Sequence, residues 1–176
     1  MKKPSRLMPK YREKPTTLMG WFLLLLFISG VTWLIWSAPI ILLIVPVLIY
    51  TEYVNGKESK KHYELLINGR ENDSICTFTR YFEYREIDTW VIRAVYEQLQ
   101  NYMAPIRKGF PIHPTDDVFT DLRIDDEDFE LDLIEEIAER TGRSLEGSES
   151  NEYYGKSDTV ENLVYFFNNQ PKVNET

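Results

Sequence analysis

A run of thirty residues without a charged side chain, Trp21 to Tyr50, constrains this chain more than any other feature. A bilayer core about 30 Å thick is crossed by roughly 20 helical residues. Thirty helical residues would measure about 45 Å, which is too long for one span without a strong tilt. The run therefore predicts either one tilted span or two spans joined by a tight turn.

A proline in the middle of the run favours two spans. Pro39 disfavours helical geometry at the residue before it, so we expect a turn at 36–39. The first span then covers 17–36, and a slightly short second span covers 38–54. A soluble core helix is a poor alternative, because nothing else in the chain is large enough to cover thirty apolar residues.

The aromatic residues of the run agree with a hairpin, because tryptophan and tyrosine prefer the membrane–water interface. In a hairpin, Trp21, Tyr50 and Tyr53 reach one interface. Trp33 and Trp36 reach the other, whereas a single span centred on the run would bury both near the middle of the membrane.

Basic residues flank the run on both sides. Six basic residues and one acidic residue lie in 1–16, and three lysines follow the run within 57–61. Positive flanks predict that both termini are cytoplasmic, in a multi-pass protein of the bacterial inner membrane. A cleaved signal peptide is disfavoured, because its apolar region usually has 7–15 residues and no small-residue cleavage pattern follows Tyr50.

The net charge of −8 is distributed unevenly, with a basic N-terminal head and an acidic remainder of the chain. The basic head suits an anionic leaflet, while 51–176 carries fourteen basic and twenty-seven acidic residues. Such an acidic segment is repelled by nucleic acid, so we expect the lipid bilayer and a basic protein as partners, and no nucleic acid. With Cys76 as the single cysteine and two histidines, we expect no metal and no cofactor.

The residues after the run predict short helices. We expect one at 62–67, a turn at Asn68-Gly69, and a second helix at 74–84 with apolar residues three and four apart. Together with the next helix, 74–103 can be interpreted as a helix-turn-helix. A DNA-binding segment should carry a basic face, and this one carries few arginines among several acids, so packing onto the next domain is the favoured interpretation.

Three amphipathic helices are predicted in the last ninety or so residues. The first covers 90–103 after a cap at Asp88 or Thr89, and the second covers 126–141 and ends at Gly142. The third opens at Asp158, which has capping-box spacing to Glu161. The chain thus divides into a basic head (1–16), a membrane hairpin (17–54), a connector (55–86), a helical domain (87–170) and a tail (171–176).

The order of motifs in 87–170 resembles an acyl carrier protein. The motifs are Ile112-His-Pro-Thr-Asp116, Val118-Phe-Thr-Asp-Leu122, an acidic helix and Asp158-Thr-Val160. In that family an Asp-Leu pair leads to Asp-Ser-Leu at the start of the second helix, and a Thr-Val pair opens the last one. The resemblance implies an acyl carrier-like helical bundle for 87–170. Together with the hairpin predicted from the apolar run, we expect an all-α chain: an N-terminal transmembrane helical hairpin followed by a small acyl carrier-like bundle.

One position departs from the carrier pattern. Counted from Asp121-Leu122, the family's modified serine falls on Asp126, which has no hydroxyl to carry phosphopantetheine. The chain is therefore more similar to a bacterial acyl carrier-like group of unknown function that lacks this serine. The resemblance implies the carrier fold without carrier activity.

We expect a non-catalytic domain that binds a partner protein through an acidic helix. The predicted contact residues are the acids of that helix: Asp125, Asp126, Asp128, Glu130, Glu135 and Glu136. The same acids do not fit an EF-hand, because the sixth and twelfth positions counted from Asp126 hold leucine and isoleucine. The alternatives are a true phosphopantetheine carrier at the membrane and a membrane-tethered DNA-binding regulator that uses 74–103.

Overall fold

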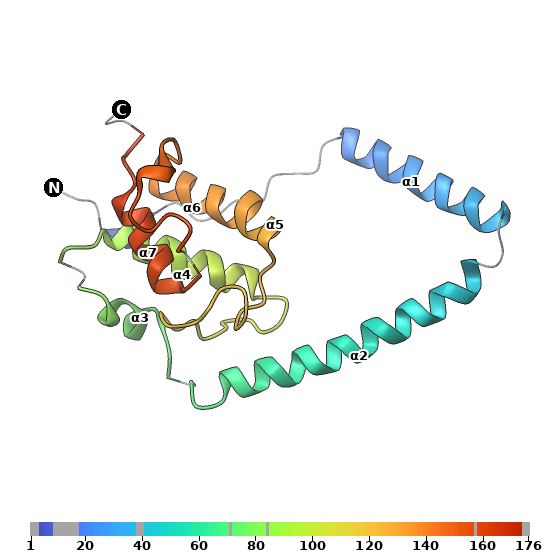
Figure 1. Cartoon of the computed structure of the whole chain (residues 1–176), viewed down its shortest axis with the longest axis horizontal. Coiled ribbons are helices and arrows are strands. Elements are labelled where there is room, and N and C mark those ends of the chain that lie inside the picture. The colour runs from blue at the N-terminus through green and yellow to red at the C-terminus, as the bar shows by residue number, and fades with distance from the viewer. Residues whose placement is uncertain are drawn as a thin grey trace. The chain divides into compact units, whose positions relative to one another are not determined.

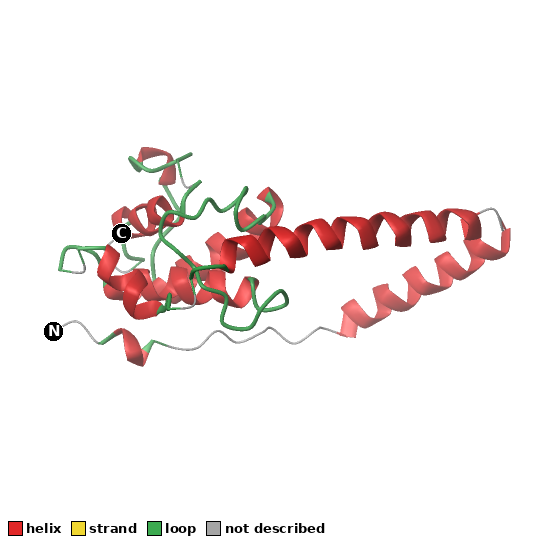
Figure 2. Ribbon diagram, turned by 90° about the horizontal axis from the view of Figure 1, so that it is seen from below, coloured by secondary structure: helices red, strands yellow, loops and turns green. Residues whose placement is uncertain are grey.

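The computed structural model describes residues 4–8, 18–37, 41–70, 72–83, 85–156 and 158–173. These residues form helices and connecting loops, with no strand beyond two isolated bridges, Asp117 with Thr159 and Arg143 with Lys172. Figure 1 labels the α-helices, and Figure 2 distinguishes the helices from the loops. The prediction of an all-α chain is confirmed for the described residues.

The chain divides into two compact units. Unit 1 comprises Met1–Lys10 and Leu66–Thr176, and unit 2 comprises Tyr11–Leu65. Unit 1 therefore combines a segment before the apolar run with a segment after it. Unit 1 contains the residues of the predicted helical domain, 87–170, together with those from Leu66 onward and the first ten residues of the chain.

Unit 2 begins with α1, Leu18–Ser37, which matches the first predicted span to within one residue. The helix is apolar around its whole circumference, and almost all of its side chains are exposed in the protein. Its few hydroxyl groups donate to the helix's own carbonyl groups: Thr32 Oγ1 lies 2.8 Å from Ile28 O, and Ser37 Oγ lies 2.9 Å from Trp33 O. Such bonds satisfy polar groups where water is absent.

The second helix, α2, is longer than predicted, running from Ile41 to Ile67 through Pro46. The expected end near residue 54 and the separate helix at 62–67 are wrong, because no proline follows Pro46 in this segment and the lysines and glutamates of 57–64 are good helix formers. The helix ends at the predicted turn, where Gly69 has a φ of +85°. The predicted turn between the spans falls partly on 38–40, which lie outside the described residues.

Among the described residues, α1 is the one helix long and apolar enough to cross a membrane. α2 does not meet the same criterion, because Glu52, Lys57 and Glu58 follow its apolar first half. A second full-length span is therefore not supported by length and composition.

Unit 1 is built around α4, Thr89–Tyr102. Asp88 caps the helix by accepting a hydrogen bond from the Trp90 backbone N–H at 3.0 Å. α4 packs against α3 (Ile75–Tyr81), α6 (Ile134–Thr141), α7 (Val160–Asn169) and the short 3-10 helix η1 (Ser5–Leu7). It contributes Val91, Val95 and Leu99 to the core, and all three are fully buried.

The second part of the predicted connector, from Leu66 onward, contributes to this core. The ring centroids of Phe78 on α3 and Tyr96 on α4 lie 5.1 Å apart, and Phe78 and Phe82 are both buried. Packing onto the next helix, the favoured interpretation of 74–84, is confirmed.

The predicted helix at 126–141 is continuous and contains one wider turn. It runs through α5 (Asp126–Asp128), a π turn η2 (Phe129–Leu133) and α6, and it ends at Gly142 with a φ of +63°. In Figure 1 the labels α5 and α6 mark its two ends. Its N-cap is Asp125, whose carboxylate accepts from the Asp128 backbone N–H at 2.9 Å.

The last helix, α7, begins at Val160, one residue later than a cap at Asp158 would place it. Its N-cap is Thr159, whose hydroxyl accepts from the Asn162 backbone N–H at 3.3 Å, and not Asp158. The Asp158 carbonyl instead accepts from the Val118 N–H at 2.7 Å, which ties the long loop after α4 to the start of α7. The expected cap is wrong because Asp158 lies in a turn, and the extended residue just before the helix is Thr159, which forms the isolated bridge with Asp117.

Candidate functional site

The start of the acidic helix presents carboxylates to solvent. Asp125, Asp126, Glu127 and Glu130 are exposed, and three of them lie in or just before the first helical turn. Carboxylates are stabilised there by the helix dipole, and Asp125 also satisfies an unpaired backbone N–H. The acids at the start of the predicted contact surface are therefore explained in part by helix capping.

The remaining predicted contact residues differ in their surroundings. Glu135 is exposed and Glu136 is half-buried. Asp128 is also half-buried, and it accepts a hydrogen bond of 2.5 Å from the Tyr102 hydroxyl at the end of α4. Asp128 therefore joins two helices, so its carboxylate is less available to a partner than those of Asp126 and Glu130.

A cavity of about 370 Å³ opens beside the first turns of this helix. Its walls come from the acidic helix, the loop after α4, the segment 145–158 and α7. The lining residues are Phe119, Asp126, Phe129, Glu130, Ile134, Leu145, Ser148, Tyr154, Gly155, Asp158 and Phe166.

The cavity combines apolar walls with acidic side chains. Phe119 and Phe129 pack edge to face with their ring centroids 5.1 Å apart. The carboxylates that line it belong to Asp126, Glu130 and Asp158, all exposed. Such a site can take a bulky apolar side chain and attract a positive charge beside it.

The π turn lies at this cavity. A π turn inserts one residue into the helical repeat, so it changes which side chains share a face before and after it. Phe129 and Glu130 stand in the turn and Ile134 follows it, and all three line the cavity. Sequence reasoning identified Asp126 and Glu130 but missed the cavity and Asp158, which was interpreted as a cap.

A buried carboxylate lies elsewhere in unit 1. Asp116 accepts from the His113 backbone N–H at 2.8 Å and pairs with the Arg70 guanidinium at 2.6 Å. Burial raises the pKa of the Asp116 carboxyl above its usual value, although these two partners act to lower it. Both residues belong to unit 1, so the pair fastens the segment at Arg70 to the loop before α5.

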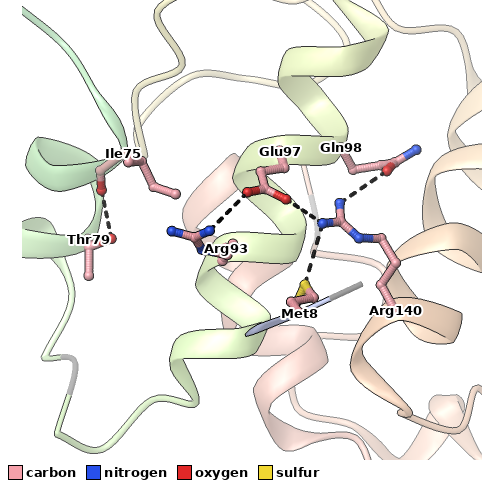
Figure 3. Close-up of polar contacts among 7 residues, drawn as sticks. All are labelled: Met8, Ile75, Thr79, Arg93, Glu97, Gln98 and Arg140. Carbon is pink, nitrogen blue, oxygen red and sulfur yellow. Dashed lines mark hydrogen bonds and ion pairs between the residues drawn. The ribbon is translucent and has the colours of Figure 1, made fainter. Parts of the chain in front are cut away.

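A second polar cluster lies between α4 and α6, shown in Figure 3. Arg140 on α6 pairs with Glu97 on α4, and Glu97 also pairs with Arg93 at 3.4 Å. The other guanidinium contacts of Arg140 are Gln98 Oε1 at 3.5 Å and the Met8 sulfur at 3.4 Å. Sequence reasoning gave no sign of this cluster, because its members are far apart in the chain.

Comparison with known proteins finds no matching family, no similar curated protein and no similar solved structure. The function of the chain is therefore inferred from its own residues.

Proposed function

We propose that this chain is a membrane-anchored protein-interaction module. An N-terminal helical hairpin holds it in the bacterial inner membrane, with both termini in the cytoplasm. Its folded domain is acyl carrier-like and non-catalytic, and it binds a basic partner protein at the acidic helix and the adjoining cavity.

The membrane anchor is supported by the character of α1. The helix is uniformly apolar, it is exposed along its length, and its hydroxyls bond to its own backbone. A helix that is hydrophobic all round needs an apolar environment, and here the protein does not supply one. Tryptophans near each end of α1 suit a span whose ends lie at the two membrane interfaces, and basic residues on both sides of the apolar run support a hairpin.

The contact surface is supported by one observation above the others: the exposed carboxylates of Asp126 and Glu130 line an apolar cavity. Long-range attraction by the acids would speed the approach of a basic segment. Burial of an apolar side chain in the cavity would then slow its release.

The acyl carrier resemblance supports a binding role and argues against a carrier role. Asp126, at the position of the family's modified serine, is the first residue of the acidic helix and lies on the cavity wall. Because a carboxylate cannot form the phosphopantetheine ester, intact-mass analysis after co-expression with a phosphopantetheinyl transferase should show the unmodified mass. An adduct of the prosthetic group would support a true carrier instead.

A DNA-binding role for 74–103 is less compatible with the packing. α4 would serve as the recognition helix, yet it packs against helices on several sides and most of its apolar residues are buried. A recognition helix needs a free face that can enter the major groove.

Charge reversal tests the contact surface. Partners of the full chain are captured by cross-linking in intact membranes, with the wild type and with the double variant Asp126→Lys and Glu130→Lys. We expect the variant to lose a partner that the wild type captures. The matched control, Glu83→Lys and Glu86→Lys, makes the same change in net charge at exposed residues between α3 and α4 and should retain it. Equal capture by both double variants would contradict the proposal.

A further inference from the structure

The residues before the apolar run belong to the unit formed by the residues after it. Pro4–Met8 fold into a single 3-10 turn, in which the Leu7 N–H donates to Pro4 O at 2.9 Å and the Met8 N–H donates to Ser5 O at 3.0 Å. This turn packs against α4. A basic N-terminal head, expected at the membrane surface, therefore begins as part of a folded domain.

Met8 holds this turn in place. Its side chain is 8% exposed, although Arg6 and Leu7 beside it are exposed. The sulfur accepts from Arg140 Nη2 at 3.4 Å, and the Arg140 side chain is itself 8% exposed. Methionine is suited to such a contact, because its flexible thioether fills irregular gaps. Met8 and Arg140 therefore cover each other between α4 and α6.

We propose that residues 4–8, here called the N-terminal clasp, are a docking element whose seat on unit 1 is formed by α4 and α6 around Arg140. The clasp fixes the topology of the chain: the segment between the clasp and Leu66 leaves unit 1 and returns to it on the same side of the membrane. This second statement rests on the membrane anchoring proposed above, whereas the docking itself does not.

The topology follows because a bilayer cannot divide a folded unit. If α1 alone crossed the membrane, the clasp and its seat would lie on opposite sides and could not meet. An even number of crossings is required, so the apolar first half of α2 must bring the chain back. Residues 41–54 provide about 21 Å of helix. This is less than the core of about 30 Å, and local thinning of the bilayer accommodates short spans.

Single cysteines test the docking in the full chain in detergent. Cys76 is the chain's one cysteine and is exposed, so Cys76→Ser supplies a clean background. In that background, Met8→Cys should react with a maleimide at least about tenfold more slowly than Arg6→Cys, after each rate is divided by its rate in denaturant. Tenfold corresponds to about 1.4 kcal/mol of opening free energy.

A second part of this test truncates Arg140, the central residue of the site on which the clasp docks. Arg140→Ala should raise the reaction rate of Met8→Cys, while Arg80→Ala, a change at an exposed arginine of α3, should leave it unchanged. Equal rates at positions 6 and 8 with Arg140 intact would overturn the clasp, whatever the effect of Arg140→Ala on folding.

The topology is tested in sealed vesicles with a membrane-impermeant maleimide. We expect Cys76 in the wild type and Arg6→Cys in the Cys76→Ser background to be labelled from the same side. Labelling from opposite sides, in a chain that resists alkaline carbonate extraction, would overturn the same-side topology and leave the anchor intact. Release of the chain by carbonate would instead contradict the proposed anchor, and the docking would still be judged from the rates in detergent.

Discussion

Two helices of this protein, α1 and α4, carry many apolar residues and meet opposite surroundings. Those of α4 alternate with polar residues along the helix and are mostly buried against α3, α6 and α7. Those of α1 surround the helix, and almost all are exposed. The difference shows that the arrangement of apolar residues, more than their number, indicates whether protein or lipid covers a helix.

The two units also satisfy their polar groups differently. In α1, the hydroxyls of Ser29, Thr32 and Ser37 each donate to a carbonyl three or four residues earlier in the same helix. In unit 1, charged groups pair between distant segments, as Arg70 does with Asp116 and Arg140 with Glu97. Because the hydroxyls of α1 bond within the helix, α1 needs no polar partner from another element. In unit 1, ion pairs between distant segments hold the helices and loops together.

The largest predicted effect is on core packing. Leu99→Ala should lower the free energy of unfolding of unit 1 by about 2–5 kcal/mol, because Leu99 is fully buried between helices. Leu25→Ala, the same change on exposed α1, should cost less than about 1 kcal/mol. Urea unfolding in detergent, followed by Trp90 fluorescence in a variant whose other tryptophans are phenylalanine, measures both. Similar losses of unfolding free energy for the two variants would contradict the claim that α4 is covered by protein and α1 is not.

The next effect is on membrane insertion. Leu26→Arg should lower the fraction of chain that resists carbonate extraction, because an arginine at the centre of a span costs about 2.5–3.5 kcal/mol. Leu131→Arg is the control, since Leu26 and Leu131 are 53% and 58% exposed. We expect no change for Leu131→Arg, because water covers that side chain. Equal extraction of the two variants would count against a lipid environment for α1.

A smaller effect concerns the buried carboxylate. Because the pKa of Asp116 is raised in the folded state, its contribution to stability is fully present below the ordinary value of 3.8 and is lost as the pH rises through the raised pKa. Each unit of that rise is worth about 1.4 kcal/mol. The stability of the wild type relative to Asp116→Asn should therefore fall with increasing pH above 3.8.

Urea unfolding at a series of pH values measures this difference. Thr32→Val is the matched comparison in α1, where a hydroxyl bonded to its own helix is removed and no pH dependence is expected. A constant difference between wild type and Asp116→Asn from pH 4 to 7 would contradict the raised pKa.

The smallest effect separates capping from binding within the acidic helix. Asp125→Ala should lower the stability of unit 1 by about 1 kcal/mol, because it removes the N-cap. Asp126→Ala should leave stability nearly unchanged, because the Asp126 carboxylate is exposed. Partner capture should show the reverse order, with Asp126→Ala the more damaging. Equal stability of the two variants would argue against the cap at Asp125.

Sequence reasoning predicted the helices well where periodicity and caps coincide. Asp88 before α4 and Gly142 after α6 mark helix ends by local chemistry, and both predictions are confirmed. It failed at α2, because no proline follows Pro46 there and the lysines and glutamates of 57–64 continue the helix past the change from apolar to polar residues. It also failed at Asp158, which lies in a turn, so that Thr159 caps the helix.

The site was less predictable than the helices. The acids of the helix were visible in the sequence, but the cavity beside them depends on the π turn and on segments far apart in the chain. The clasp was likewise hidden, because Met8 lies in a basic head and gives no periodic signal. Contacts between distant segments are determined by the whole fold, and one sequence does not reveal them.

Tryptophan quenching in reconstituted vesicles tests the central claim most directly. Of the chain's four tryptophans, Trp21, Trp33 and Trp36 lie on α1, and Trp90 lies on α4. Variants that keep a single tryptophan are compared in lipids brominated near the headgroup or deep in the acyl chain. A hairpin anchor predicts that Trp36 is quenched more by the shallow bromines and that Trp90 is quenched by neither. Stronger quenching of Trp36 by the deep bromines, or equal quenching of Trp36 and Trp90, would contradict the account.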